Sequence, residues 1–214
     1  MRGILRTTFV TAAVAVALTG CADQDDPDDA VGDDPAVTTG SDDDRGGAHD
    51  RDGTEVALVD ATGAQIGTAW VEDDDGGVGI EVEVADLSPG FHGFHLHAVG
   101  LCEPDSPDPT DPAKVGDFLS AGGHVGGDAA DHGAHAGDLP SLLVDDAGAG
   151  TLTVRTATVT LDDLLDDDGT ALVLHVDPDN FAHVPERYAP AGPDEQTLRT
   201  GDAGDRVACG VLGE

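Results

Sequence analysis

The stretch GFHGFHLHAVGLCEP, residues 90–104, holds three of the chain's nine histidines. If residues 91–97 form a strand, alternation sends His95 and His97 to one face and the apolar Phe94 and Leu96 to the other. The two imidazoles then lie about 7 Å apart at Cα and can bind one ion. Imidazole suits copper and zinc, although an i, i+2 pair of histidines is by itself a weak indication of a metal site.

Two later segments strengthen this indication. The segment SAGGHVGGDAADHGAHAGDLPSL supplies three imidazoles and one carboxylate, a set that suits tetrahedral zinc: His124, His132, His135 and Asp138. The segment TALVLHVDPDNF places His175 at the end of an apolar strand, on the face opposite the strand's leucines and Val176. The sequence thus holds further candidate metal ligands in two later parts of the chain.

A β architecture is expected to position these residues. From residue 54 onward, short runs of strand-forming residues alternate with turns rich in Gly or Asp. The predicted strands are 55–59, 65–71, 78–84, 91–97, 139–144, 150–159, 171–176 and 206–212. A short helix is expected near Thr160, because TLDDLLDDDG has Asp in its first turn and Gly beyond its end. We therefore predict an all-β fold, an eight-stranded Greek-key barrel or sandwich of immunoglobulin-like type.

Two segments, 102–138 and 177–205, are too long and too rich in glycine to be tight turns. Long ordered loops in a compact β domain usually carry function. Both contain candidate site residues, so we expect them to be functional loops.

The N-terminal residues predict export. Arg2 and Arg6 precede a mostly apolar run, 9–18, that is too short to span a bilayer. The run ends in LTGC, which resembles the cleavage site of bacterial lipoprotein signals, in which the cysteine becomes the acylated first residue. We expect a lipoprotein signal peptide over 1–20, lipidation of Cys21 and an acidic disordered tether over 21–53, so that the domain 54–214 is anchored to the outer face of the cell membrane. An ordinary signal peptide with an incidental Cys21 is the alternative.

Charge and cysteine content narrow the function further. The formal net charge is −35, with nine Lys and Arg against 44 Asp and Glu, so nucleic acid is not an expected partner. Apart from Cys21, only Cys102 and Cys209 remain, and one such pair in an exported chain predicts one disulfide. Arg206 lies three residues before Cys209.

Taken together, the motifs resemble those of copper–zinc superoxide dismutases of the bacterial, exported type. GFHGFHLH, CEP, SAGGH, HxGD, LVLHV followed by DN, and GDRVACGV occur in that family's order between residues 54 and 213. This combination is very specific. The resemblance implies an oxidoreductase with copper and zinc that converts superoxide to dioxygen and hydrogen peroxide.

Carried over to this chain, the resemblance implies two metal sites that share one imidazole. The copper ligands would be His95, His97, His124 and His175. The zinc ligands would be His124, His132, His135 and Asp138. Asp179 would link a copper histidine to a zinc histidine, Arg206 would be the cationic residue beside copper, and His124 would also carry a proton. Cys102 and Cys209 would form the family's disulfide.

One feature departs from the family pattern. Only two residues separate His132 from His135, whereas the family usually has a longer stretch there. Both rings can reach one ion only if the loop folds tightly, which Gly133 and Gly137 would favour. His92, at an odd offset from the metal-facing histidines of its strand, is expected to face away and to bond to backbone. His183 is expected to be an ordinary loop residue.

An alternative function stays open: a copper-binding or copper-storage lipoprotein of the same fold without significant dismutase activity. Arg206 and the complete copper set favour the enzyme, because a carrier needs no residue that guides an anionic substrate. Members of the family pair in different ways or not at all, so the sequence leaves a homodimer open.

Overall fold

Nine strands form one antiparallel sheet in the computed structural model, which describes residues 53–213. They are β1 (Thr54–Val59), β2 (Gln65–Asp74), β3 (Gly77–Val84), β4 (Gly90–His92), β5 (Phe94–His97), β8 (Leu142–Val144), β9 (Gly150–Thr156), β10 (Thr170–His175) and β11 (Arg206–Leu212). Their order across the sheet is β4-β8-β9-β3-β2-β1-β11-β10-β5. The neighbours β3–β9 and β1–β11 are far apart in sequence, so the chain crosses over between hairpins, as in a Greek key.

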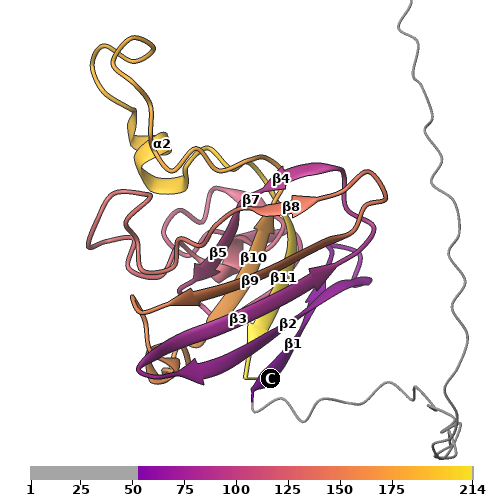
Figure 1. Ribbon diagram of the computed structural model, residues 1–214. Coiled ribbons are helices and arrows are strands. Elements are labelled where there is room, and N and C mark those ends of the chain that lie inside the picture. Colours follow the sequence, from indigo (N-terminus) through magenta and orange to yellow (C-terminus); the bar gives the residue numbers. More distant parts are fainter. Residues whose placement is uncertain (1–52, 214) are drawn as a thin grey trace, which may run out of the picture. The chain divides into compact units, whose positions relative to one another are not determined.

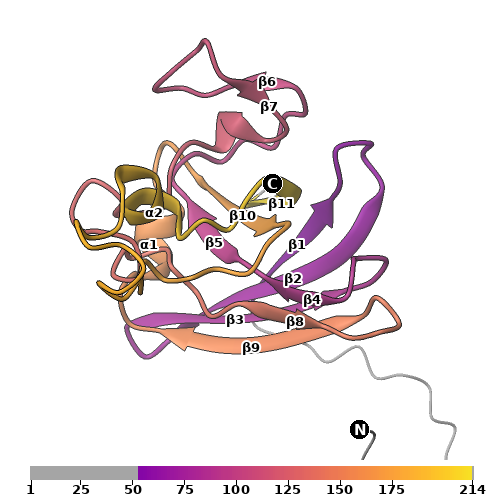
Figure 2. The ribbon, with the colours of Figure 1, turned by 90° about the horizontal axis from the view of Figure 1, so that it is seen from above.

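The strand predicted over 91–97 is divided at Gly93 into β4 and β5, which stand at the two ends of the sheet order. One interrupted strand thus makes the sheet a nearly closed barrel (Figure 1 and Figure 2). Gly93 donates its N–H to the Asp177 carbonyl at 2.9 Å, and a Cβ there would come within 2.7 Å of the Ala203 side chain. The division therefore requires a residue without a side chain. The all-β barrel predicted from the sequence is confirmed.

The barrel interior is the apolar core. Phe94 and Leu96 are fully buried in it, together with Leu172 and Leu174 of β10, as strand alternation predicts. Val176 does not join them, because it lies beyond the end of β10 and is 40% exposed. Burying these side chains supplies most of the favourable free energy of folding, at about 1.5–3 kcal/mol for each large apolar side chain.

Short elements lie in and around the two long loops. The predicted short helix is α1 (Leu161–Leu164), whose N-cap Thr160 accepts a hydrogen bond from the Asp163 N–H in a capping box. The first long loop contains β6 (Ser106–Pro107), β7 (Val115–Gly116) and a 3₁₀ turn (Leu119–Ala121), and the β6–β7 hairpin projects from the barrel (Figure 2). The second contains α2 (Glu195–Thr200). None of these loop elements was predicted, since each is too short to show a periodic apolar pattern.

No helix among residues 53–213 is long and apolar enough to cross a membrane. The predicted signal peptide, Cys21 and all of the tether except residue 53 lie outside the described residues.

Candidate metal centre

Four buried imidazoles converge beside β5 and β10. Their potential ligand atoms all lie within 4.8 Å of one another, and we call this group the four-histidine cluster: His95, His97, His124 and His175. Pairing of β5 with β10 sets the first two rings on the side of the strand away from the core. A register shift between Leu174 and His175 brings the latter opposite Arg206 of β11. The structure thus brings together all four predicted copper ligands.

The outer ring nitrogens of these histidines are already occupied by protein groups. His97 Nδ1 lies 2.9 Å from the Gly122 carbonyl oxygen, and His175 Nδ1 lies 3.0 Å from that of Gly204. The Nε2 atoms of the same two rings face each other at 3.4 Å. His95 has Nε2 at 2.8 Å from Asp179 Oδ2, while its buried Nδ1 has no hydrogen-bond partner. Buried polar atoms are rarely left without partners, so these inward nitrogens fit a bound cation such as copper.

A second group, the histidine–aspartate cluster, shares His124 with the first. Its potential ligand atoms also lie within 4.8 Å of one another: His124, His132, His135 and Asp138. The Nδ1 atoms of the three rings lie 2.8, 3.1 and 3.2 Å from Asp138 Oδ1, in that order. The Nδ1 atoms of His124 and His135 are 3.3 Å apart. Three nitrogens around one carboxylate oxygen form a donor set that fits zinc.

The short interval between His132 and His135 does not prevent their convergence. Gly133 lies between them with φ +86°, a left-handed conformation that a glycine adopts at little cost. The backbone N–H of Gly133 and that of His135 both donate to Asp138 Oδ2, at 2.7 and 3.0 Å. The loop is therefore folded back on Asp138.

Asp179 joins the two clusters. Its Oδ2 lies 2.8 Å from His95 Nε2, and its Oδ1 lies 2.8 Å from His132 Nε2. All three side chains are completely shielded from solvent. A carboxylate on the outer nitrogen fixes the orientation of a ring and makes its other nitrogen a better metal ligand.

Burial and charge set the protonation of the site. Burial lowers the pKa of His124 to about 4, although the hydrogen bond to Asp138 opposes the shift, so the ring is neutral at pH 7. Burial, and then the charge of Arg206, hold the pKa of His97 well below its usual value. Burial also opposes a charge on His132, but Asp138 and Asp179 outweigh it and raise the pKa to about 9. Hydrogen bonds to the histidines keep the pKa of both carboxyls below the usual range, against the effect of burial.

Arg206 is fixed at the edge of the four-histidine cluster. Its Nη1 donates to the Phe118 carbonyl at 2.5 Å, and its Nη2 donates to the Gly122 carbonyl at 2.6 Å. Burial lowers its pKa to about 10, so the guanidinium remains charged at neutral pH. The Gly122 carbonyl also lies against His97 Nδ1, so one backbone oxygen positions both a candidate ligand and the cation. Backbone acceptors have no side-chain signature, and sequence reasoning missed this one.

The other sequence predictions can be placed as well. The disulfide between Cys102 and Cys209 is confirmed. His92 faces away from both clusters, with its ring nitrogens 2.7 Å from the His175 carbonyl oxygen and 2.8 Å from that of Ser88. His183 is exposed in the second loop and is in neither cluster.

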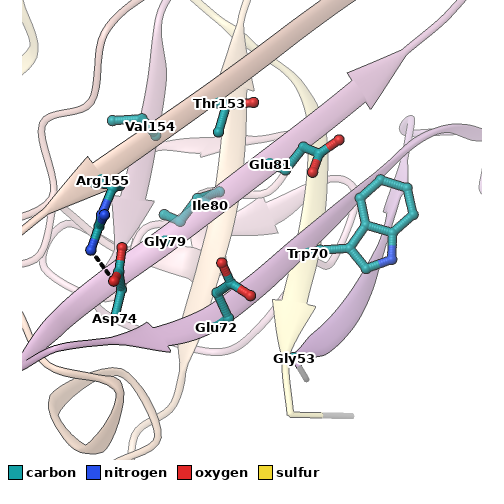
Figure 3. Close-up of a pocket in the computed structure, with 10 residues that line it drawn as sticks. All are labelled: Gly53, Trp70, Glu72, Asp74, Gly79, Ile80, Glu81, Thr153, Val154 and Arg155. Atoms are coloured by element: carbon teal, nitrogen blue, oxygen red, sulfur yellow. Dashed lines mark hydrogen bonds and ion pairs between the residues drawn. The ribbon is translucent and has the colours of Figure 1, made fainter. Parts of the chain in front are cut away.

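A surface pocket lies elsewhere, on the outer face of the barrel (Figure 3). It is lined by Gly53, which precedes β1, and by residues of β2, β3 and β9: Trp70, Glu72, Asp74, Gly79, Ile80, Glu81, Thr153, Val154 and Arg155. Arg155 is paired with Asp74 in it. The lining contains three carboxylates and no histidine or cysteine, so the pocket suits neither an anion nor a soft metal.

Comparison with known proteins gives a consistent result. Residues 65–212 match the family model described as copper/zinc superoxide dismutase. The chain is 42% identical to "Superoxide dismutase [Cu-Zn]" of Mycolicibacterium paratuberculosis, over 95% of this chain and 96% of that protein. It is 40% identical to the protein of that name from Mycobacterium tuberculosis, over 98% of this chain and 92% of that one.

Solved structures agree with these sequence matches. The Cu/Zn superoxide dismutase of Brucella abortus matches with a TM-score of 0.58 and 28% identity, covering 74% of this chain and 98% of that one. A double mutant of a SOD-like protein from Bacillus subtilis matches with a TM-score of 0.58 and 30% identity, covering 75% of this chain and 97% of that one. With two histidine clusters joined by one imidazole and a family match over most of its length, this chain belongs to the copper/zinc superoxide dismutase family.

Proposed function

We propose that this protein converts superoxide to dioxygen and hydrogen peroxide, 2 O2⁻ + 2 H⁺ → O2 + H2O2. His95, His97, His124 and His175 would hold copper, and His124, His132, His135 and Asp138 would hold zinc. The observation that carries the proposal is that one buried imidazole, His124, belongs to both clusters. A copper-storage protein needs a set of ligands, but it needs neither this shared ring nor a charged guanidinium beside it.

Arg206, His124 and Asp179 have distinct roles in the proposed reaction. When bound, copper supplies the one-electron oxidation of one superoxide and the one-electron reduction of another, while zinc supplies a redox-inert charge. Arg206 attracts the anionic substrate and orients it by charged hydrogen bonds. His124 is neutral at pH 7, and with Nδ1 taken up as a zinc ligand its one proton would lie on Nε2, from which the product peroxide could receive it. Asp179 keeps the rings of His95 and His132 in fixed orientations.

Net charge and substrate charge have the same sign, since the chain carries −35 and superoxide is an anion. Steering of superoxide by the local field is already well known for superoxide dismutases as a class. In this chain Arg206 is a cation in direct hydrogen-bond contact with the loop that borders the four-histidine cluster. The positive charge of Arg206 at this site therefore opposes the overall negative charge, whose effect is screened over about 8 Å at physiological salt.

Replacing Arg206 with alanine tests the role of the guanidinium. We expect kcat/KM for superoxide to fall about 10- to 100-fold, because a hydrogen bond to a charged group contributes about 1.5–3 kcal/mol. Copper content should not change, since Arg206 is not a ligand. The rate is measured by pulse radiolysis and the copper content by elemental analysis, with Arg206→Lys as the variant that keeps the charge. An unchanged rate in Arg206→Ala would remove this residue from the mechanism.

We also propose that the protein is exported and anchored by lipid at Cys21. Support comes from the apolar run 9–18 and the LTGC sequence that follows it. Intact-mass analysis of the protein from the producing cells should find an acylated chain that begins at Cys21, and a Cys21→Ser variant should leave the membrane fraction. Finding the unmodified chain in the membrane fraction would contradict the proposal. A homodimer stays a prediction that analytical ultracentrifugation decides.

A further inference from the structure

The ring of His132 is held mainly by the second long loop rather than by its own. Its backbone N–H donates to the carbonyl of Leu198, in α2, at 2.8 Å. Its Nε2 lies 2.8 Å from Asp179 Oδ1, in the segment that follows β10. In both views α2 lies beside the loop of residues 125–138 (Figure 1 and Figure 2). Since only two residues join His132 to His135, support from outside the short loop matters here.

Phe181 makes three contacts with this part of the site. Its ring is stacked on the ring of His132, with centroids 6.3 Å apart and planes inclined by 20°. Its N–H donates to Asp179 Oδ1 at 2.6 Å, the same oxygen that contacts His132. Its carbonyl oxygen lies so close to Gly133 that a Cβ on that residue would come within 2.6 Å. One residue thus touches the ring, its carboxylate partner and the backbone that follows the ring.

The backbone of this turn is strained. Phe181 has φ 54° and Ala182 has φ 52°, left-handed conformations that residues other than glycine rarely adopt. Asn180 holds the turn in place: its Oδ1 accepts from the Ala182 N–H at 2.7 Å, and its Nδ2 donates to Asp202 Oδ2 at 2.6 Å. Such strain persists only where neighbouring contacts enforce it, and here the enforced result is that Phe181 lies on His132.

Gly201 supports the same pair from another direction. It ends α2 with φ +59°, and its carbonyl accepts the Asn180 N–H at 2.9 Å. A Cβ at this position would overlap both Asp179 Oδ1 and His132 Nε2. The hydrogen bond between the latter two is therefore enclosed by Phe181 and Gly201, and both side chains that form it are fully shielded from solvent.

We propose that Phe181 is a positioning residue of the zinc site, which holds the ring of His132 so that Nδ1 points at the other zinc ligands. The proposal rests on the assignment of zinc to the histidine–aspartate cluster. In the structure His132 Nδ1 faces Asp138 Oδ1 at 3.1 Å but makes no hydrogen bond there, so this contact alone does not fix the orientation of the ring. The stacked ring and the dry bond to Asp179 fix it instead. Phe181 thereby supplies the preorganisation that the short His132–His135 interval does not.

The test is the affinity of the full-length chain for Zn²⁺, measured by competition with a chromophoric chelator, with copper bound and without it. Phe181→Ala should weaken Zn²⁺ binding about 10- to 100-fold, the usual effect of removing a group that orients a ligand. Phe181→Tyr keeps the stacked ring and should stay within about threefold of the original protein. Phe91→Ala, which removes a phenyl ring that is 53% exposed on β4, should have no effect. Phe181 itself is 41% exposed, so both substitutions remove a phenyl ring of comparable exposure.

Co²⁺ gives a second readout that does not depend on activity. Its visible absorption in the histidine–aspartate cluster reports ligand geometry, and Phe181→Ala should change that spectrum while Phe181→Tyr retains it. Unchanged Zn²⁺ affinity in Phe181→Ala, or an equal loss of copper and zinc affinity, would overturn the proposed role of Phe181 and leave the zinc assignment intact. If Phe181→Ala does not fold, Phe181→Leu, which keeps apolar volume without a flat ring, decides in its place. An unsubstituted chain that binds neither Zn²⁺ nor Co²⁺ here would overturn the zinc assignment as well.

Discussion

Replacing His124 with alanine is expected to remove zinc from the protein and to lower kcat/KM for superoxide about 10²- to 10⁴-fold, the range typical for loss of a positioned proton donor. His124 is the one residue that contributes to both clusters, so its loss alters both at once. The histidine–aspartate cluster loses a ring whose Nδ1 is 2.8 Å from Asp138 and 3.3 Å from His135 Nδ1. The four-histidine cluster keeps three imidazoles, so copper should still bind, although more weakly.

Elemental analysis of the purified variant measures the metal content, and pulse radiolysis measures the rate. His183→Ala is the matched control, because this histidine is exposed and outside both clusters. Circular dichroism establishes that both variants fold. Normal zinc content together with a normal rate in His124→Ala would contradict the shared-imidazole assignment and with it the proposed mechanism.

Strand alternation was enough to predict which side chains of β5 meet the other histidines. The period of two separates the apolar pair Phe94 and Leu96 from the histidine pair, and the structure buries the first pair in the core. The same reasoning failed for Val176, because the chain leaves β10 one residue earlier. Sequence pattern predicts the face of a residue only while the strand continues.

The convergence of the three segments was predicted from the resemblance to a family, not from physical reasoning about the residues. Nothing local in the sequence brings Asp138 into an isolated bridge with His95, or His124 into one with His97, since these contacts depend on how the barrel closes. The contacts of Phe181 and Gly201 were missed for a related reason. They depend on backbone conformations and on a packing between two loops that have no periodic pattern to read.

Removing the disulfide by the double substitution Cys102→Ala and Cys209→Ala is expected to lower the free energy of unfolding by about 4–5 kcal/mol. The bond joins residues 107 apart in sequence, and closing so long a loop lowers the entropy of the unfolded chain. At 25 °C this entropy loss raises the free energy of the unfolded chain by about 4–5 kcal/mol. Cys209 is completely buried among Phe118, Ala121, Ala171 and Val173, so alanine is preferred to serine because it buries no hydroxyl group. Urea unfolding of the metal-free protein measures the change.

The same substitution should reduce activity, because the disulfide secures the loop that bears the Phe118 and Gly122 carbonyls. The Phe118 oxygen accepts a hydrogen bond from Arg206 Nη1, and the Gly122 oxygen accepts one from Nη2. The Gly122 oxygen also lies against His97 Nδ1. A loop released by about 1 Å would misplace the guanidinium relative to the four-histidine cluster, so we expect kcat/KM to fall at least about tenfold. The comparison is made at a temperature where the variant is still folded and loaded with metal, with the unsubstituted protein, its disulfide intact, as the reference. A variant that loses the stability but keeps the full rate would show that the barrel alone, without this covalent tie, holds Arg206 in place.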